Sequence, residues 1–209
     1  MEENGNGPRQ RRRAPGRDER QRDPERSREL LLNAALDEFS AKGFAGARVQ
    51  DIARRAGVNK QLISYYFGGK EGLYRAIERR WLEQETTFAQ PDISFEDLIV
   101  EYLRANLEDP RMLRLLIWNG LSDPGIGDDA DKAANAAEDV SDLKRRQETG
   151  EIAGDFDPAL LQLALMGAIA APIIMPQVVR RLTGLGYDSR EFQRAYAEEL
   201  RRIVRRLAA

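Results

Sequence analysis

The chain is 209 residues long and contains 33 Lys and Arg, 35 Asp and Glu, and no cysteine or histidine. The lack of Cys and His excludes disulfides, thiolate chemistry, the usual zinc ligands and the usual general base near neutral pH. The sequence also lacks glycine-rich phosphate loops of the P-loop and dinucleotide types. We therefore expect no catalytic residue, no metal site and no cofactor. An enzyme that uses only Asp, Glu or Lys is an alternative without a supporting pattern.

The charges divide along the chain. Residues 1–80 contain 18 Lys and Arg against 12 Asp and Glu, whereas residues 81–209 contain 15 against 23. A basic N-terminal part followed by an acidic part fits a DNA reader attached to a lobe that stays away from DNA. The alternative is that the charge simply fluctuates along the chain.

The first segment, residues 1–22, consists mainly of Arg, Gly, Asn, Gln and Pro. It has no large apolar residue apart from Met1, so we predict a flexible basic arm that buries no core. Its arginines can follow a DNA backbone or enter a minor groove, and a solubilising tail explains them equally well. The arginine-rich start contains no export signal, and we expect a cytoplasmic protein.

A first helix is predicted to start at Asp23 and Pro24, as a cap followed by proline in the first turn, and to end at Gly43. Phe44 would pack beneath the segment that follows. One side of the predicted helix is apolar, at Leu32, Ala35, Leu36 and Phe39.

Two short helices around a tight turn are predicted over residues 49–70. The first ends at Gly57, where a left-handed conformation suits glycine, and Asn59 can cap the second, which a Gly-Gly pair ends. Helical spacing puts four apolar or aromatic side chains of the second helix on its inner side: Leu62, Ile63, Tyr66 and Phe67. Its other side holds groups that can donate to phosphates or to base edges in a major groove: Lys60, Gln61, Ser64 and Tyr65.

The remaining elements are also predicted to be helical. A helix from Lys70 would join both parts of the chain through an apolar side formed by Leu73, Ile77, Trp81 and Phe88. Two helices over 95–107 and 110–121, a loop over 122–129 and an alanine-rich helix to about Glu148 would follow. No alternating strand pattern competes, so the chain is predicted to be all-α with about nine helices.

The two final helices have the clearest start signals. The first is predicted to start at Asp157 and Pro158 and to bend at two later prolines, Pro172 and Pro176. Because residues 159–179 are nearly uncharged, a membrane span is one interpretation of this helix, and a helix buried in a protein bundle is the favoured one. The last helix has an apolar packing seam at Phe192, Tyr196, Leu200, Ile203 and Leu207.

Three spaced motifs occur in the N-terminal part: A-x-x-x-F-x-x-x-G-F at residues 35–44, D-I-A-x-x-A-G-V at 51–58 and Y-Y-F-x-x-K at 65–70. Together they resemble the tetracycline-repressor (TetR) family of bacterial transcription regulators. The similarity covers residues 29–73 and fades beyond about Trp81. After the flexible arm predicted at 1–22, it implies a three-helix helix-turn-helix DNA-binding domain at 23–69 and a helical ligand-binding and dimerisation domain at 70–209.

The resemblance further implies a homodimer that inserts one helix per subunit into successive major grooves of a roughly palindromic double-stranded operator. Ala47, Arg48 and Ser64 depart from the residues common in the family, so the operator cannot be transferred from a relative. Matching the family positions one at a time gives the residues expected at the DNA: Arg48, Asn59, Lys60, Gln61, Ser64, Tyr65, Tyr66 and Lys70.

Family members typically bind a small molecule in the second domain and then leave the operator. The resemblance therefore implies an unidentified and mainly apolar effector, although plain core is the more frequent role of apolar residues at helical spacing. The candidate pocket residues are Phe95, Tyr102, Met112, Leu115, Trp118, Met166 and Ile169.

Dimerisation is expected to use the two final helices, with small residues that allow close approach and the apolar seam of the last helix. The predicted function is a ligand-released repressor without a membrane partner, and the alternative is a helical adaptor or small-molecule carrier that does not bind DNA. The expected interface residues are Gly167, Ala168, Ala171, Phe192, Tyr196, Leu200, Ile203 and Leu207.

Overall fold

The structure is a computed structural model that describes residues 17–90, 92–122 and 140–207. Within these ranges the chain forms ten helices and no strand, which confirms the all-α prediction. The first part of the predicted arm, most of the predicted loop and the start of the alanine-rich helix lie outside the described residues. The helices are α1 (Arg17–Gly46), α2 (Val49–Ala56), α3 (Gln61–Phe67), α4 (Lys70–Phe88), α5 (Phe95–Glu108), α6 (Arg111–Ser122), α8 (Ser141–Glu148), α9 (Pro158–Ile174), α10 (Pro176–Thr183) and α11 (Arg190–Arg205).

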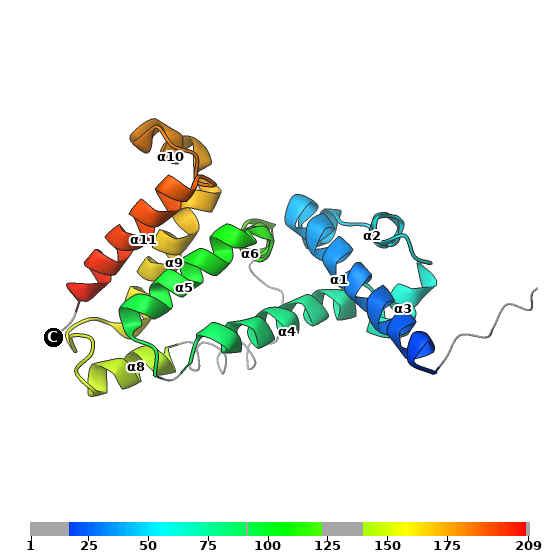
Figure 1. The fold of residues 1–209 in the computed structure, drawn as a ribbon, viewed down its shortest axis with the longest axis horizontal. Helices are drawn as coiled ribbons and strands as arrows, with labels where there is room; N and C mark the ends of the chain where they lie inside the picture. The colour runs from blue at the N-terminus through cyan, green and yellow to red at the C-terminus, as the bar shows by residue number, and fades with distance from the viewer. Residues whose placement is uncertain (1–16, 91, 123–139, 208–209) are drawn as a thin grey trace, which may run out of the picture.

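The helices form two groups at opposite ends of the molecule, with α1, α2 and α3 in one group and α5, α8, α9 and α11 in the other (Figure 1). Helix α4 runs from the first group to the second. Its Leu73 and Ile77 are buried in the first group, and its Phe88 packs edge-on against Tyr102 of α5 at a ring-centroid distance of 5.1 Å. The prediction that this helix joins both parts of the chain is therefore confirmed.

Helix α1 begins at Arg17, so the start predicted at Asp23 is wrong and Pro24 lies inside the helix. Residues 17–22 are mainly Arg, Glu and Gln, which favour helix. The helix therefore continues upstream, although Pro24 lacks an amide and its ring crowds the preceding turn. Gly43 interrupts the helix as predicted, with a φ of 69° that suits glycine.

The first group has a single apolar core in which every helix takes part. Leu31 and Phe39 of α1, Ile52 of α2, Ile63 of α3 and Leu73 of α4 are all fully buried there. Phe44 follows the break in α1 and packs against this core, which contains residues of α2 and α3, as the sequence predicts, and it also stacks on Phe39. These contacts fix the angle between α2 and α3, because each helix is held by its own buried side chain.

Helix α6 also belongs to this core, although the sequence assigned it to the C-terminal domain. Its Leu115 is fully buried in the cluster that contains Phe39 and Ile63. The Arg111 guanidinium donates to the Asp37 carboxylate of α1 at 2.6 Å, and a Cβ atom added to Gly43 of α1 would lie 3.4 Å from the Trp118 ring. The first core therefore includes a helix that follows α5 in the chain.

A polar contact fixes α6 to α4 as well. The Asn119 amide donates a hydrogen bond to the Tyr74 hydroxyl, and the Tyr74 ring packs edge-on against Phe39 and Phe44. Burial, together with the nearby charge of Glu78, raises the pKa of Tyr74 to about 12. The hydroxyl therefore stays protonated and can serve as both acceptor and donor at this junction.

The second core joins α5, α8, α9 and α11. Leu103 of α5, Leu143 of α8, Leu165 of α9 and Leu200 of α11 are buried in it. Helix α11 packs along α5, and the Tyr196 hydroxyl of α11 donates to the carbonyl of Ala168 at 2.8 Å. This arrangement explains why the apolar side of α11 faces its own subunit.

Helices α9 and α10 confirm the predicted start and the predicted bend. Asp157 caps α9 by accepting a hydrogen bond from the Leu160 amide at 3.0 Å, and the axes of α9 and α10 differ by 84° across a break at Met175. Among the described residues no single helix is long and apolar enough to cross a membrane, whereas the bent pair of α9 and α10 reaches that length and composition together.

A buried arginine ties α8 to the start of α5. The Arg146 guanidinium donates to the carboxylates of Asp142 at 2.6 Å and Glu151 at 2.7 Å and to the Ile93 carbonyl at 3.1 Å. It also lies 5.5 Å from the centroid of the Phe95 ring. These partners compensate for the burial of a charge that would otherwise be costly.

We expect Leu115→Ala to lower the free energy of unfolding by about 2–5 kcal/mol, because it removes a fully buried side chain and leaves a cavity in the first core. The matched control is Leu116→Ala, the next residue in α6, which is 49% exposed and should change stability by no more than about 0.5 kcal/mol. Urea unfolding of both variants measures the difference. Equal losses would contradict the place of α6 in this core.

Candidate nucleic-acid interface

Helices α2 and α3 are joined by a tight turn whose backbone amides are satisfied locally. Gly57 ends α2 with a φ of 67°, and the Val58 amide donates back to the Ala53 carbonyl at 3.1 Å. The Asn59 side-chain oxygen then accepts a hydrogen bond from the Gln61 amide at 2.9 Å. Asn59 therefore caps α3 as predicted, and its side chain holds the turn.

Helix α3 is divided into a buried and an exposed side, as the spacing predicts. Ile63 and Phe67 are buried, and Leu62 and Tyr66 pack partly against the same core. Tyr65 is 80% exposed on the opposite side. The exposed side offers an ammonium, an amide, a hydroxyl and a phenol group side by side at Lys60, Gln61, Ser64 and Tyr65.

The turn between α3 and α4 depends on three glycines. Gly68 and Gly69 have φ values of 73° and 120°, which disfavour other residues. A Cβ atom at Gly72 would lie 1.6 Å from the Phe67 carbonyl oxygen, so α3 and α4 approach each other as closely as glycine allows. The role of Gly72 was missed in the sequence, where the only signal is three glycines within five residues.

The other predicted contact residues surround the exposed side of α3. Arg48 is exposed at the N-terminal end of α2, and the Tyr66 ring lies edge-on to Tyr65 at a centroid distance of 5.1 Å. The Lys70 ammonium lies 4.5 Å from the centroid of the Phe44 ring, and burial lowers its pKa. Lys70 thus contacts the end of α1, and it is less free to reach a phosphate than Arg48 or Lys60.

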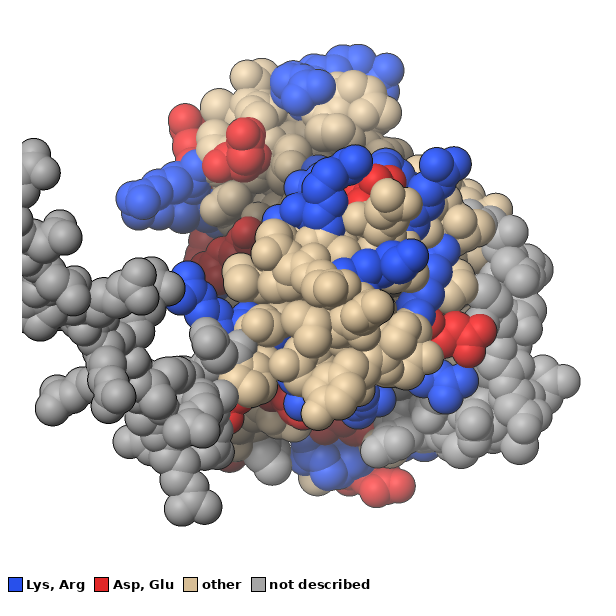
Figure 2. Space-filling model, turned by 90° about the vertical axis from the view of Figure 1, so that its right-hand side faces the viewer, with Lys and Arg blue, Asp and Glu red and all other residues tan. Residues whose placement is uncertain are grey.

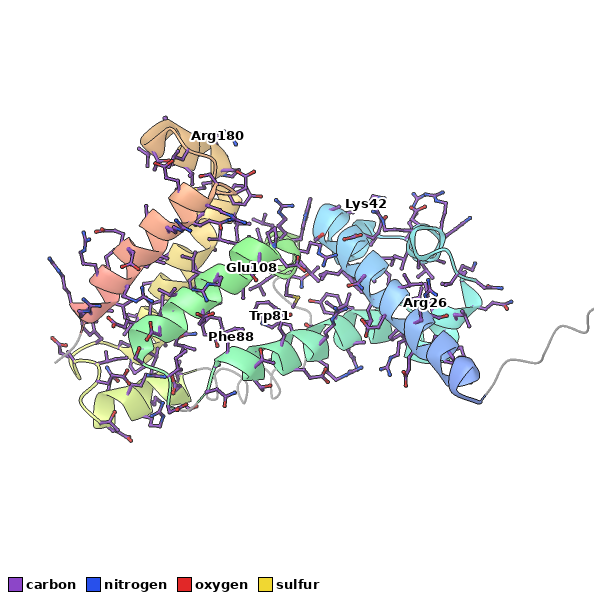
Figure 3. All side chains as sticks on the ribbon, in the orientation of Figure 1. Arg26, Lys42, Trp81, Phe88, Glu108 and Arg180 are labelled. Atoms are coloured by element: carbon purple, nitrogen blue, oxygen red, sulfur yellow. The ribbon has the colours of Figure 1, made fainter. Side chains whose placement is uncertain are left out.

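Basic side chains dominate the surface at this end of the molecule. Figure 2 faces the end that carries α2 and α3, and Lys and Arg groups surround an uncharged area there with few acidic groups. Arg26 is exposed on α1 at the same end of the molecule (Figure 3), and the Arg28 guanidinium is 5.6 Å from the Phe67 ring centroid of α3. The sequence did not lead us to expect Arg26 and Arg28 near DNA, because we assigned the additional basic contacts to the predicted arm at residues 1–22.

An ion-pair network behind α2 connects it to α1 and α6. Arg55 of α2 lies 3.6 Å from the Asp37 carboxylate of α1, and the same carboxylate pairs with Arg111 of α6 at 2.6 Å. Lys42 pairs with Glu38 on α1 and lies 3.7 Å from Asp51 of α2. Asp37 therefore connects α2, which belongs to the predicted DNA-binding domain, to α6.

The seven predicted pocket residues do not share one site. Leu115 and Met112 belong to the first core, and Trp118 covers Gly43, because α6 packs on α1. Phe95 and Ile169 are buried in the second core. Tyr102 packs partly against the same core and donates to Glu85 of α4, whereas Met166 is exposed on α9.

The predicted dimer seam is largely internal to one subunit. Phe192 and Leu200 are buried, and Tyr196 and Leu207 pack against the second core, because α11 lies along α5. Periodicity alone cannot distinguish a seam within a subunit from one between subunits. Ile203 and Gly167 remain exposed, and Ala168 and Ala171 are partly covered.

The described residues contain no group of three or more Asp and Glu side chains placed to hold a metal ion. Helix α3 is thus a short helix whose outer side exposes hydrogen-bond donors, whose inner side is fixed in a buried core, and which has arginines around it. This arrangement defines a protein of the helix-turn-helix DNA-binding class.

Comparison with known proteins gives the family. Residues 31–77 match the family described as bacterial regulatory proteins, tetR family, and residues 95–206 match the one described as tetracyclin repressor-like, C-terminal domain. The chain is 34% identical over 169 residues to the HTH-type transcriptional repressor SCO4008 of Streptomyces coelicolor, with 79% of this chain and 88% of that protein covered. The chain therefore belongs to the TetR family of transcriptional regulators.

Further relatives agree with this assignment. The HTH-type transcriptional regulator RutR of Escherichia coli K12 is 42% identical over 88 residues, which cover 40% of this chain and 41% of RutR. The crystal structure of the putative transcriptional regulator SCO4942 from Streptomyces coelicolor has the same fold, with a TM-score of 0.69 at 23% identity over 87% of this chain and 98% of that one. These relatives are named as regulators, which points away from an enzyme.

Proposed function

We propose that the protein is a homodimeric repressor that reads a palindromic operator with α3 and leaves it when a small molecule binds. The observation that carries this proposal is the division of α3, whose inner side is fixed in the first core while its outer side exposes Lys60, Gln61, Ser64 and Tyr65. A helix of this kind fits a major groove, where amide and hydroxyl groups meet base edges and an ammonium meets phosphates.

The surrounding basic groups supply the part of the affinity that does not depend on sequence. Arg48, and Arg26 on the neighbouring helix, are exposed at the same end of the molecule as α3. Each phosphate that such a group neutralises releases a counterion, so binding falls steeply with salt. Asn59 acts indirectly in this scheme, because its side chain caps α3 and sets where the helix begins.

The dimer forms through the outer side of α9. Leu160, Leu163 and Met166 are exposed there, and nothing stands within 4 Å of a Cβ atom added to Gly167. Ile203 of α11 is exposed as well. An apolar strip of this length with a small residue in it favours close packing against a second copy.

Release of the operator requires a link from the second core to α3. Helix α6 supplies it, because Leu115 is buried in the first core and Arg111 shares Asp37 with Arg55 of α2. A small and mainly apolar molecule that shifts α5 moves the start of α6 and with it the first group of helices.

The test of the proposed function is selection of binding sites from random double-stranded DNA. The expected result is enrichment of one inverted repeat, with half-sites about one helical turn apart. A helical adaptor or small-molecule carrier would enrich no sequence.

We expect Lys60→Ala to weaken binding to the selected operator and to reduce the slope of log affinity against log salt by about 1, because one phosphate contact is lost. Lys144→Ala is the matched control, since Lys144 is exposed on α8 in the second group of helices. Fluorescence anisotropy at several salt concentrations measures both quantities. An unchanged slope for Lys60→Ala would remove Lys60 from the phosphate contacts.

Gln61→Ala should act differently, because an amide that meets base edges discriminates between bases. We expect the preference at one or two base pairs to relax by about 1–3 kcal/mol, with little change in the salt slope. Binding to a set of operators that differ at single positions measures this effect. If the ranking of these operators stays the same, Gln61 does not read a base.

Leu163→Arg should separate the dimer into monomers, because it places a charge in the apolar strip of α9, where Leu163 is 66% exposed in the single chain. Leu82→Arg is the control, since Leu82 is exposed on α4 away from that strip. Analytical ultracentrifugation gives the mass, and urea unfolding verifies that each variant is folded. A folded Leu163→Arg protein with the mass of a dimer would rule out this interface.

A further inference from the structure

A groove of about 270 Å³ lies between α5 and α11, on elements that the proposed reading of DNA does not use. Its floor is apolar, because Val100, Leu103 and Leu107 of α5 line it together with Ala197 of α11. The volume lies just below the range of about 300–1,000 Å³ that is usual for ligand pockets. None of the seven candidate pocket residues of the sequence lines it.

The rim of this groove has an excess of positive charge, whereas positive and negative charges are balanced over the rest of the contact between α5 and α11. The two helices are antiparallel, and at one end their charges are opposite, with Arg205 at 2.8 Å from Glu96 and Arg201 at 2.8 Å from Asp97. Toward the other end α5 presents Arg104 and Glu108. On the α11 side of this rim stand Arg190 and Arg194.

Two of these arginines have no protein partner in the described part of the chain. Arg104 pairs with Glu101 at 2.6 Å, whereas no carboxylate of a described residue lies within 4.0 Å of Arg190 or Arg194. Glu108, labelled at the end of α5 in Figure 3, also lines the groove and leaves the rim with an excess of positive charge.

We propose that this groove binds a small anionic amphiphile, a carboxylate that bears a short apolar chain. The carboxylate accepts hydrogen bonds from Arg190 and Arg194, beyond the end of the row of ion pairs between the two helices. The chain lies on Val100, Leu103 and Ala197. A purely apolar molecule leaves the arginines without a partner, and a small anion leaves the apolar floor exposed.

The probe for this proposal is octanoate, titrated calorimetrically into the full-length protein without DNA. We expect octanoate to bind, and acetate and 1-octanol, which supply only the charge or only the chain, to bind at least about tenfold more weakly. Equal binding of 1-octanol, or no binding of octanoate, would overturn the proposal. Because no DNA is present, this result is independent of whether the protein is a repressor.

Two variants assign the binding to the groove. Arg190→Gln with Arg194→Gln should weaken octanoate binding by about tenfold or more, while Arg180→Gln with Arg181→Gln on α10 removes the same charge elsewhere and should leave it unchanged. Ala197→Leu should abolish binding by filling the groove without removing a charge. Octanoate binding that survives both groove variants, with unfolding midpoints unchanged, would place the site elsewhere.

Discussion

The burial of Leu115 in the first core is the contact on which the arrangement of the whole molecule depends. Helix α6 follows α5 in the chain, yet its central leucine is fully enclosed by α1 and the helix pair. Leaving that cluster would cost the transfer of a whole leucine side chain into water and would open a cavity around Phe39. Helix α3 and the second core are therefore joined by packed apolar surface as well as by α4.

Charge reinforces this junction where the apolar contact ends. Asp37 stands between Arg111 of α6 and Arg55 of α2, so one carboxylate has partners on both sides of α1. Each of these groups is partly exposed, and each pair by itself therefore contributes little to stability. These ion pairs instead couple α6 to α2, because a shift of α6 moves the carboxylate with which Arg55 of α2 also pairs.

The elements that the sequence predicts correctly are those determined by neighbours along the chain. The two sides of α3, the stops at Gly57 and Gly68, and the Asn59 cap follow from spacing within about ten residues, and the structure agrees with each of them. The partner of an apolar side is determined by tertiary packing instead. Periodicity could therefore not reveal that Leu115 enters the first core or that Leu200 faces α5.

The same distinction applies to the candidate site residues. The sequence predicts which polar side chains a local helix exposes, but it does not predict which apolar side chains line a pocket between two helices. An exposed Lys60 or Tyr65 needs only the local helix to be positioned, whereas a pocket requires a gap between two helices that the sequence does not encode locally. The groove between α5 and α11 is lined by the small Ala197 and by three arginines, and each of these residues is unremarkable in its own segment. No local pattern brings Arg104 and Arg194 together, because 90 residues of chain separate them.

The proposed dimer adds a geometric condition to the α6 junction. If the outer sides of α9 pair, the second cores become one rigid unit, and the separation of the two α3 helices is set by how α4 and α6 hold each first group. Successive major grooves on one face of DNA lie about 34 Å apart, so both helices fit only within a narrow range of separations. A small change at the α6 junction is then multiplied by the length of α4 before it reaches α3. Packed apolar contacts suit this role, because Leu115 in its core has one well-fitted position and resists intermediate ones.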